Sequence, residues 1–179
     1  MEASQNAPFT FAYVEKLLSK KNFGILSTIT PEGKSHSIGV VYSISPPSQP
    51  FSIYLITRLV LKKARNIHSN PNVSFVVPFP HYVFRTVPPS CIQFQGKAEL
   101  ISIDNPIATK AFQRSIVLRR SMMHSISLGG ESTFIKIIPD NKILSFGIGA
   151  NIWQFLLRSK NENLGNYHVI VPERRRYYD

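Results

Sequence analysis

Cysteine is almost absent from this chain of 179 residues, and long apolar runs are missing altogether. The lone Cys91 has no partner for an internal disulfide, which is typical of a protein in a reducing compartment. No apolar stretch approaches the roughly 20 residues that a membrane-spanning helix needs. Residues 1–11 also lack the basic-then-apolar pattern of a secretion signal. We therefore expect a cytoplasmic protein with no membrane partner.

Acidic residues are scarce as well, and the chain carries a formal net charge of +11. Such an excess of positive charge favours an anionic ligand, a nucleic acid or an anionic surface. The cations are dispersed along the chain, and neither a zinc-finger spacing nor an aromatic–basic RNA-binding motif accompanies them. We expect weak, non-specific binding of nucleic acid at most.

Recognisable catalytic and metal motifs are also missing. The HExxH motif, the P-loop and the GxGxxG fingerprint are absent, and no Ser-His-Asp or paired-carboxylate pattern is evident. We therefore predict neither a metal site nor a catalytic side chain. The length and a hydrophobic content of 43% suit one globular domain over residues 1–179, with a C-terminal extension over 149–179.

The most informative stretch covers residues 51–77. Its first part alternates as a strand does and ends at Thr57 and Arg58. A short helix follows, with Lys62 and Lys63 near its start, and an Asn-Pro pair ends it before a second apolar strand. Free N–H groups and the helix dipole attract anions to such a start. These side chains can bind a phosphate, although a basic pair on a solvated helix face is the alternative.

The remaining pattern predicts a mainly β protein with flanking helices. We expect strands over 23–29, 35–44, 51–57, 73–77, 90–102, 134–139, 142–146 and 167–171. Further helices are expected over 8–21, 104–123 and 152–158, the second of them capped by Asp104. The proline-rich residues 78–89 are expected to form a loop, because proline lacks the N–H that a central strand needs.

Three motifs, in this order, resemble those of the pyridoxamine-phosphate-oxidase-like proteins, the FMN-binding split β-barrels. They are the hairpin FGILSTITPEGKSHSIGVVYSI, the central stretch described above, and the strand IQFQGKAELIS with its Gly-x-Ala pattern. The similarity covers roughly residues 10–145. It implies a six-stranded antiparallel split β-barrel with flanking helices, FMN as cofactor, and a homodimer whose flavin sites lie between the subunits.

The resemblance also implies roles for individual residues. In this family a Thr at the strand end and the following basic pair hold the FMN phosphate, and one strand runs along the flavin. Here the resemblance assigns the phosphate-binding role to Thr57, Lys62 and Lys63, with Ile56 and Arg58 beside them. The flavin strand is formed by Ser37, Ile38, Gly39, Val40 and Val41. Cys91 stands where the oxidase branch has a flavin-bonding Gln, with Gln93 two residues on, and Phe146 matches the aromatic that covers the partner's flavin.

The resemblance bears on the reaction class too. The oxidase branch ends in an Arg-x-His motif that binds the pyridoxal substrate, and His168 here lacks the preceding arginine. We therefore expect an FMN-dependent oxidoreductase that acts on an unidentified small molecule and is not a pyridoxamine phosphate oxidase. The flavin carries the hydride chemistry, so no catalytic side chain is required. The alternative is a non-enzymatic binder of flavin, deazaflavin (F420) or haem on the same fold.

Overall fold

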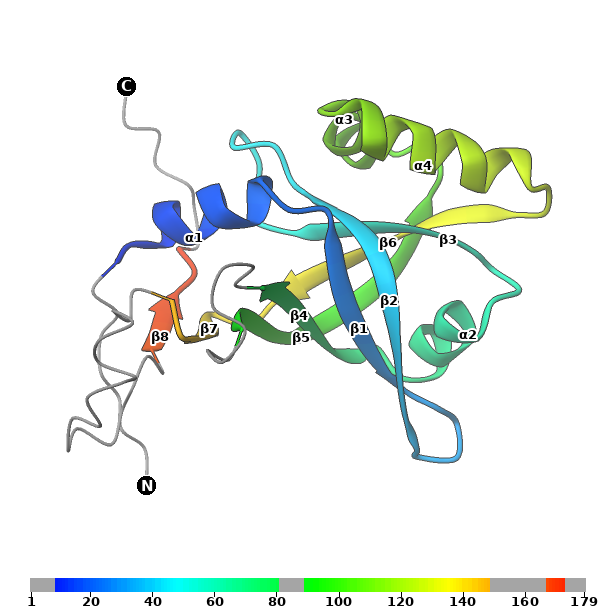
Figure 1. The fold of residues 1–179 in the computed structure, drawn as a ribbon. Coiled ribbons are helices and arrows are strands. Elements are labelled where there is room, and N and C mark those ends of the chain that lie inside the picture. The colour runs from blue at the N-terminus through cyan, green and yellow to red at the C-terminus, as the bar shows by residue number, and fades with distance from the viewer. Residues whose placement is uncertain (1–8, 81–88, 149–166, 173–179) are drawn as a thin grey trace.

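A closed antiparallel β-barrel forms the body of the protein in the computed structural model, which describes residues 9–80, 89–148 and 167–172 (Figure 1). Within those residues the strands are β1 (Phe23–Ile29), β2 (Ser35–Ile44), β3 (Ile53–Arg58), β4 (Asn72–Phe79), β5 (Ser90–Ser102), β6 (Ser132–Pro139), β7 (Lys142–Phe146) and β8 (Tyr167–Ile170). Neighbouring strands follow the order β4-β1-β2-β3-β6-β5, and pairing of β4 with β5 closes these six into a barrel. The expected mainly β split barrel is confirmed.

The last two strands extend the sheet beyond β5, because β7 pairs with β5 and β8 pairs with β7. Part of the expected C-terminal extension therefore joins the sheet. The predicted helix over 152–158 lies outside the described residues, so it stays a prediction.

Most strand boundaries agree with those expected, but β4 runs further than predicted. Pro78 was expected in a loop, yet it lies in β4 opposite Cys91 of β5. The pairing of β4 with β1 ends at Val76, so β4 has a neighbour on one side only at Pro78. A missing N–H is tolerated at such an edge position, as it is on edge strands generally.

The described helices are α1 (Phe11–Ser19), α2 (Lys62–Ser69), α3 (Pro106–Gln113) and α4 (Ile116–Ser127). Of these, α1 and α2 lie at opposite ends of the barrel (Figure 1). Val14 and Leu18 of α1 and Ile67 of α2 pack into the barrel core with Phe75 and Phe94. Apolar burial of this size, about 1.5–3 kcal/mol per large side chain, holds α1 and α2 in place. None of the described helices has the length and hydropathy to cross a membrane.

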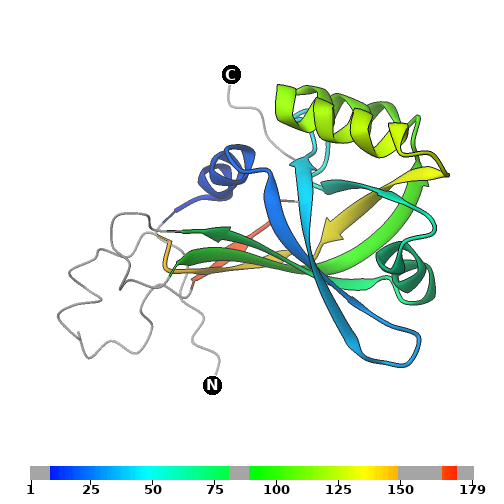
Figure 2. The same cartoon turned by 45° about the vertical axis from the view of Figure 1, so that its right-hand side comes forward.

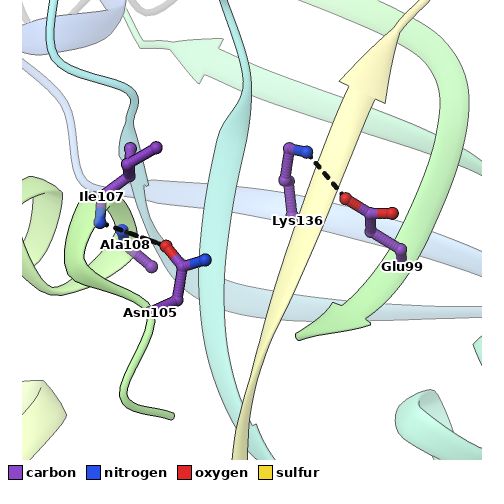
Figure 3. A network of polar contacts seen from close by, with 5 residues as sticks. All are labelled: Glu99, Asn105, Ile107, Ala108 and Lys136. Carbon is purple, nitrogen blue, oxygen red and sulfur yellow. Dashed lines mark hydrogen bonds and ion pairs between the residues drawn. The ribbon is translucent and has the colours of Figure 1, made fainter. Parts of the chain in front are cut away.

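The expected single helix over 104–123 is two helices, and Asp104 is not its cap. The Asn105 side chain accepts hydrogen bonds from two N–H groups of the first turn of α3, both at 3.1 Å (Figure 3). Pro106 is suited to the first helical position, where its missing N–H costs nothing, and this places the cap at the residue before it. Ser115 caps α4 in a similar way.

A second apolar cluster joins α3 and α4 to one side of the barrel (Figure 2). Phe112, Leu118 and Met122 pack there against Tyr54 of β3 and Phe134 of β6. No described helix covers the outer face that β1, β4 and the first half of β5 form, and this face carries two of the exposed apolar side chains.

Two glycines mark close approaches inside the sheet, for different reasons. A Cβ on Gly96 of β5 would collide with the carbonyl oxygen of Ile138 and lie 2.7 Å from Cα of Pro139. A Cβ on Gly39 of β2 would meet ring atoms of Phe23 at 2.9 and 3.0 Å. The Phe23 ring therefore explains Gly39 by packing alone.

Alanine at these two positions should have unequal effects on stability. We expect Gly96→Ala to lower the free energy of unfolding by about 1–3 kcal/mol, because the backbone of β6 cannot move aside. Gly39→Ala should cost less than about 1 kcal/mol, because the end of a flexible side chain can shift. Urea unfolding of both variants measures the difference, and equal losses would contradict this account.

Candidate functional site

The predicted phosphate-binding residues come together where β3 ends and α2 begins. Thr57 is buried, with 2% of its surface exposed, and its hydroxyl lies 3.5 Å from the Arg58 carbonyl oxygen, at the outer limit for a hydrogen bond. Arg58 and Lys63 are half-buried, whereas Lys62 is exposed. Only Lys62 therefore fits the alternative of a solvated helix face. Among the described residues the Thr57 hydroxyl has no short hydrogen bond.

The start of α2 has no side-chain cap. Leu61 occupies the cap position without a capping hydrogen bond, and the first turn of the helix contains no acidic residue. The first N–H groups of a helix have no partner within the helix, and a capping side chain usually stabilises them by about 0.5–2 kcal/mol. A bound anion can take the place of the missing cap.

Like charges converge at this junction, and no described carboxylate lies within ion-pair distance of them. Burial lowers the pKa of Lys63, and the nearby positive charge of Arg58 lowers it further. No carboxylate of the described chain forms an ion pair with Arg58, Lys62 or Lys63; the ion pair between Lys136 and Glu99 joins β5 and β6 elsewhere (Figure 3). An anion at the junction would relieve this repulsion.

The β1–β2 hairpin reaches this junction as well. A hydrogen bond with the Thr30 side chain lowers the pKa of Glu32 in the hairpin turn, and the charge of Lys62 lowers it to a smaller extent. Asn66 of α2 donates a buried hydrogen bond of 2.9 Å to the Thr28 hydroxyl of β1. The hairpin and the start of α2 are thus held next to each other.

The flavin strand predicted from the resemblance lies along a split in the barrel. β2 and β3 pair from Ile44–Ile53 to Tyr42–Leu55. Beyond that point residues 35–41 pair with β1, and residues 56–58 pair with β6. No other described strand pairs with the two diverging edges, so a ligand could bind backbone N–H and C=O groups there.

Side chains on the flavin strand face different ways. Val40 packs in the barrel core, and Val41 packs with Ile56 against the α3–α4 cluster. These residues can offer only backbone atoms to a cofactor. Ser37 and Ile38 are exposed near the start of β2.

The other predicted residues form a second group on β5 and β7. Cys91 lies opposite Phe146, and Gln93 Nε2 lies 3.5 Å from Cys91 Sγ. The register links Gly39 to Gln93 through Ile25 and Val76, three strand spacings or roughly 14 Å along the sheet. The structure thus places the predicted residues in two groups on one chain.

One histidine near the junction was missed by sequence reasoning. His36 of β2 lies opposite Thr28, and its Nδ1 atom is buried with no hydrogen-bond partner among the described residues. Its position next to the predicted flavin strand was a usable signal, but the burial of a single ring nitrogen cannot be read from a sequence pattern.

Neither of two well-formed cavities on the described part of the chain includes a predicted site residue. A cavity of about 670 Å³ lies between α1, residues 44–47 and α3, and one of about 340 Å³ lies over β1, β4 and β5. No motif marks the first, because its walls are distant in sequence. Arg114 on its wall was therefore also missed.

A closed six-stranded barrel, with α1 and α2 at its ends and a basic strand-to-helix junction at its split, defines the class of split-barrel proteins. Residues 12–140 match the family model described as pyridoxamine 5'-phosphate oxidase, and the chain belongs to this family. No curated protein sequence matches the chain significantly.

Solved structures share the fold at low sequence identity. A haem-binding protein from Mycobacterium smegmatis is 16% identical with a TM-score of 0.61, over 80% of this chain and 57% of that one. HutZ, a haem storage protein from Vibrio cholerae, is 12% identical with a TM-score of 0.58, over 74% and 92%. An FAD-binding protein from Mesorhizobium loti is 18% identical with a TM-score of 0.56, over 76% and 91%.

Replacing Lys63 should stabilise the ligand-free protein. The unfolded chain binds the Lys63 proton more tightly than the folded chain, so the free energy of unfolding rises with pH between the lowered pKa and the ordinary value of 10.5. Lys63→Met removes the cost of burying a charged side chain at this position. We expect the variant to have a higher melting temperature than the wild-type protein at pH 7. The difference between the two melting temperatures should become smaller as the pH approaches 10.5.

Sulfate provides the complementary measurement. It should raise the melting temperature of the wild-type protein more than that of Lys63→Met, because the variant has lost a cation of the anion site. Arg65→Met, at an exposed position on the same helix, should respond as the wild type does. Equal responses of all three proteins would rule out Lys63 as an anion ligand.

Proposed function

We propose that the protein binds FMN at the β3–α2 junction and is an FMN-dependent oxidoreductase acting on a small molecule. The observation that carries this proposal is the half-buried Lys63, which lies beside Arg58 at an uncapped helix start without a carboxylate partner in the described chain. A phosphate would supply the missing negative charge and accept hydrogen bonds from Thr57 and the free N–H groups of α2.

The split between β2 and β3 suits the rest of the cofactor. A flavin ring needs polar contacts at its edge and apolar contacts on its faces. Backbone groups of residues 37–41 are free on the diverging edge of β2, and exposed Ile38 offers an apolar surface nearby. FMN, when bound, supplies the hydride or electron transfer, so the chain itself need only bind, orient and shield it.

The comparisons support a flavin. The family is named for pyridoxamine 5'-phosphate oxidase, and one neighbour of the same fold is described as FAD-binding. The missing Arg-x-His motif argues against pyridoxamine phosphate as the substrate, because a substrate phosphate needs cationic partners of its own.

A homodimer would complete the site. Phe23 and Ile25 expose 51% and 36% of their surfaces on the outer face of β1, which no described helix covers. Gln93, Cys91 and Phe146 continue this outer face across β5 and β7. A second copy seated here would bury the apolar patch and bring Phe146 towards the partner's flavin.

Haem is the second candidate. Two neighbours of the same fold are described as haem proteins, and His36 has a ring nitrogen with no partner among the described residues, close to the proposed site. Neutral imidazole nitrogen is a common iron ligand.

Reversing the charge of the basic pair should weaken FMN binding. We expect Lys62→Glu/Lys63→Glu to lower the affinity more than tenfold, because each charge-assisted contact to phosphate contributes about 1.5–3 kcal/mol. Fluorescence titration of FMN measures this loss. Lys20→Glu/Arg119→Glu makes the same change of net charge at exposed positions at the end of α1 and on α4, and it should leave the affinity unchanged.

The absorbance spectrum of freshly purified protein separates the two candidates. Oxidised flavin gives its pair of bands, whereas haem gives a Soret band. An FMN affinity that the Lys62/Lys63 variant retains would remove the phosphate assignment. A Soret band that disappears in His36→Ala would replace FMN by haem.

The dimer makes a separate prediction. Light scattering at micromolar concentration should give twice the chain mass of 20.3 kDa. Phe23→Glu/Ile25→Glu should give the monomer mass and lose FMN affinity, since both effects arise at one face. Val60→Glu, at a site with 66% exposure before α2, should remain dimeric. A wild-type monomer that still binds flavin would contradict the shared site.

A further inference from the structure

The larger described cavity lies away from the β3–α2 junction, at the end of the barrel where α1 packs. Its volume is about 670 Å³, and its walls are α1, the residues that follow β2, and the end of α3. Figure 1 shows the loop after β2 between these two helices. The volume is within the range of roughly 300–1,000 Å³ that is typical of small-molecule sites.

The walls of this cavity are apolar, and charge gathers at its rim. Apolar atoms come from Ala12, Ile44, Pro46, Pro47 and Ala111. Three cationic side chains are also in the lining, and they belong to Lys16, Lys110 and Arg114. The described lining contains one carboxylate, that of Glu15, so positive charge predominates.

Arg114 is the best-placed of these cations. Its Nη2 donates to the Lys21 carbonyl oxygen at 3.4 Å, which is long for a hydrogen bond. Burial lowers the pKa of its guanidinium, and the phenol of Tyr42 opposes this lowering. That phenol is itself committed, because it donates to the Leu18 carbonyl oxygen at 2.9 Å. Arg114 is an exposed residue, and a guanidinium has five N–H donors, so a cation with donors to spare lies on the cavity wall.

We propose that this cavity is a second binding site, for a small molecule with an apolar body and one anionic head group, either a carboxylate or a phosphate. Arg114 would bind the head group, with Lys16 and Lys110 adding positive charge at the rim. The apolar walls would hold the body. The site shares no residue with the β3–α2 junction, so it does not depend on the proposed FMN binding.

A purely structural role for Arg114 does not account for the cavity or for the two other cations in its lining. Joining α3 to the end of α1 needs one hydrogen bond to a carbonyl oxygen, and helix C-termini attract cations in any case. It requires neither two further cations nor an apolar space of about 670 Å³ beside them.

Three probes with one apolar body test the proposal. Isothermal titration calorimetry of the full-length protein would use 1-naphthyl phosphate, 1-naphthoate and 1-naphthol. We expect at least one anion to bind more than tenfold more tightly than the neutral naphthol, and the tighter anion identifies the preferred head group. Failure of both anions to bind, or equal affinity for naphthol, would overturn the proposal.

Variants place the probe in the cavity. Arg114→Gln, or Lys110→Gln if the former unfolds, should weaken the anion about tenfold or more and leave naphthol binding unchanged. Ala12→Trp fills the cavity from its exposed rim and should abolish binding of the anion. Arg119→Gln, exposed on α4 outside the cavity, is the matched control. Equal effects of the Arg114 and Arg119 changes would reduce the result to general charge attraction and overturn the site.

One more measurement distinguishes binding in this cavity from binding at the proposed FMN site. Lys62→Glu/Lys63→Glu should bind the anionic probe as tightly as the wild-type protein does. Loss of probe binding in that variant would move the probe to the β3–α2 junction and overturn a second site, whereas loss of FMN binding alone leaves the cavity assignment intact.

Discussion

The close approach of β5 and β6 at Gly96 is the constraint on which the rest of the barrel depends. Gly96 is paired on one side with Val73 of β4 and on the other with Pro139 of β6. One long strand therefore closes the barrel through β4 and continues it through β6. Any side chain at this crossing would push against backbone atoms, so the glycine of the Gly-x-Ala pattern is a requirement of closure.

The barrel is irregular between β2 and β3, away from the crossing at Gly96. The ladder between β2 and β3 is short, and the two strands diverge beyond Tyr42 and Leu55. Free backbone groups, an uncapped helix start and converging cations all lie along this split. Each of these would cost stability in a protein selected for stability alone. Their coincidence is what indicates a ligand, because proteins tend to break local rules where they function.

The helices at the two barrel ends have different chemical surroundings. At the α2 end the described residues present hydroxyl and cationic groups with little apolar wall, which suits a phosphate. At the α1 end the cations surround an apolar cavity, which suits an amphipathic anion. Part of the positive charge thus gathers in two separate environments, although along the sequence the cations look dispersed.

The sequence by itself determined most of the strands and the grouping of four residues at the β3–α2 junction. Alternation and turn residues are local signals, and Thr57, Arg58, Lys62 and Lys63 are so close in the chain that a strand end and a helix start bring them together. Even so, the predicted cap of the helix over 104–123 was wrong, because two neighbouring residues compete for the cap position. Asp104 and Asn105 are both good caps, and Pro106 decided between them by its preference for the first helical position.

Only the tertiary structure decided the features that depend on distant segments. Pro78 is acceptable in β4 because the pairing of β4 with β1 ends at Val76, and Gly39 leaves room for the Phe23 ring that lies over it. The cavity at Arg114 exists because α1 and α3, nearly a hundred residues apart, meet at one end of the barrel. Pairing, burial and cavities are sums over contacts between distant residues, and a pattern along the chain does not contain them.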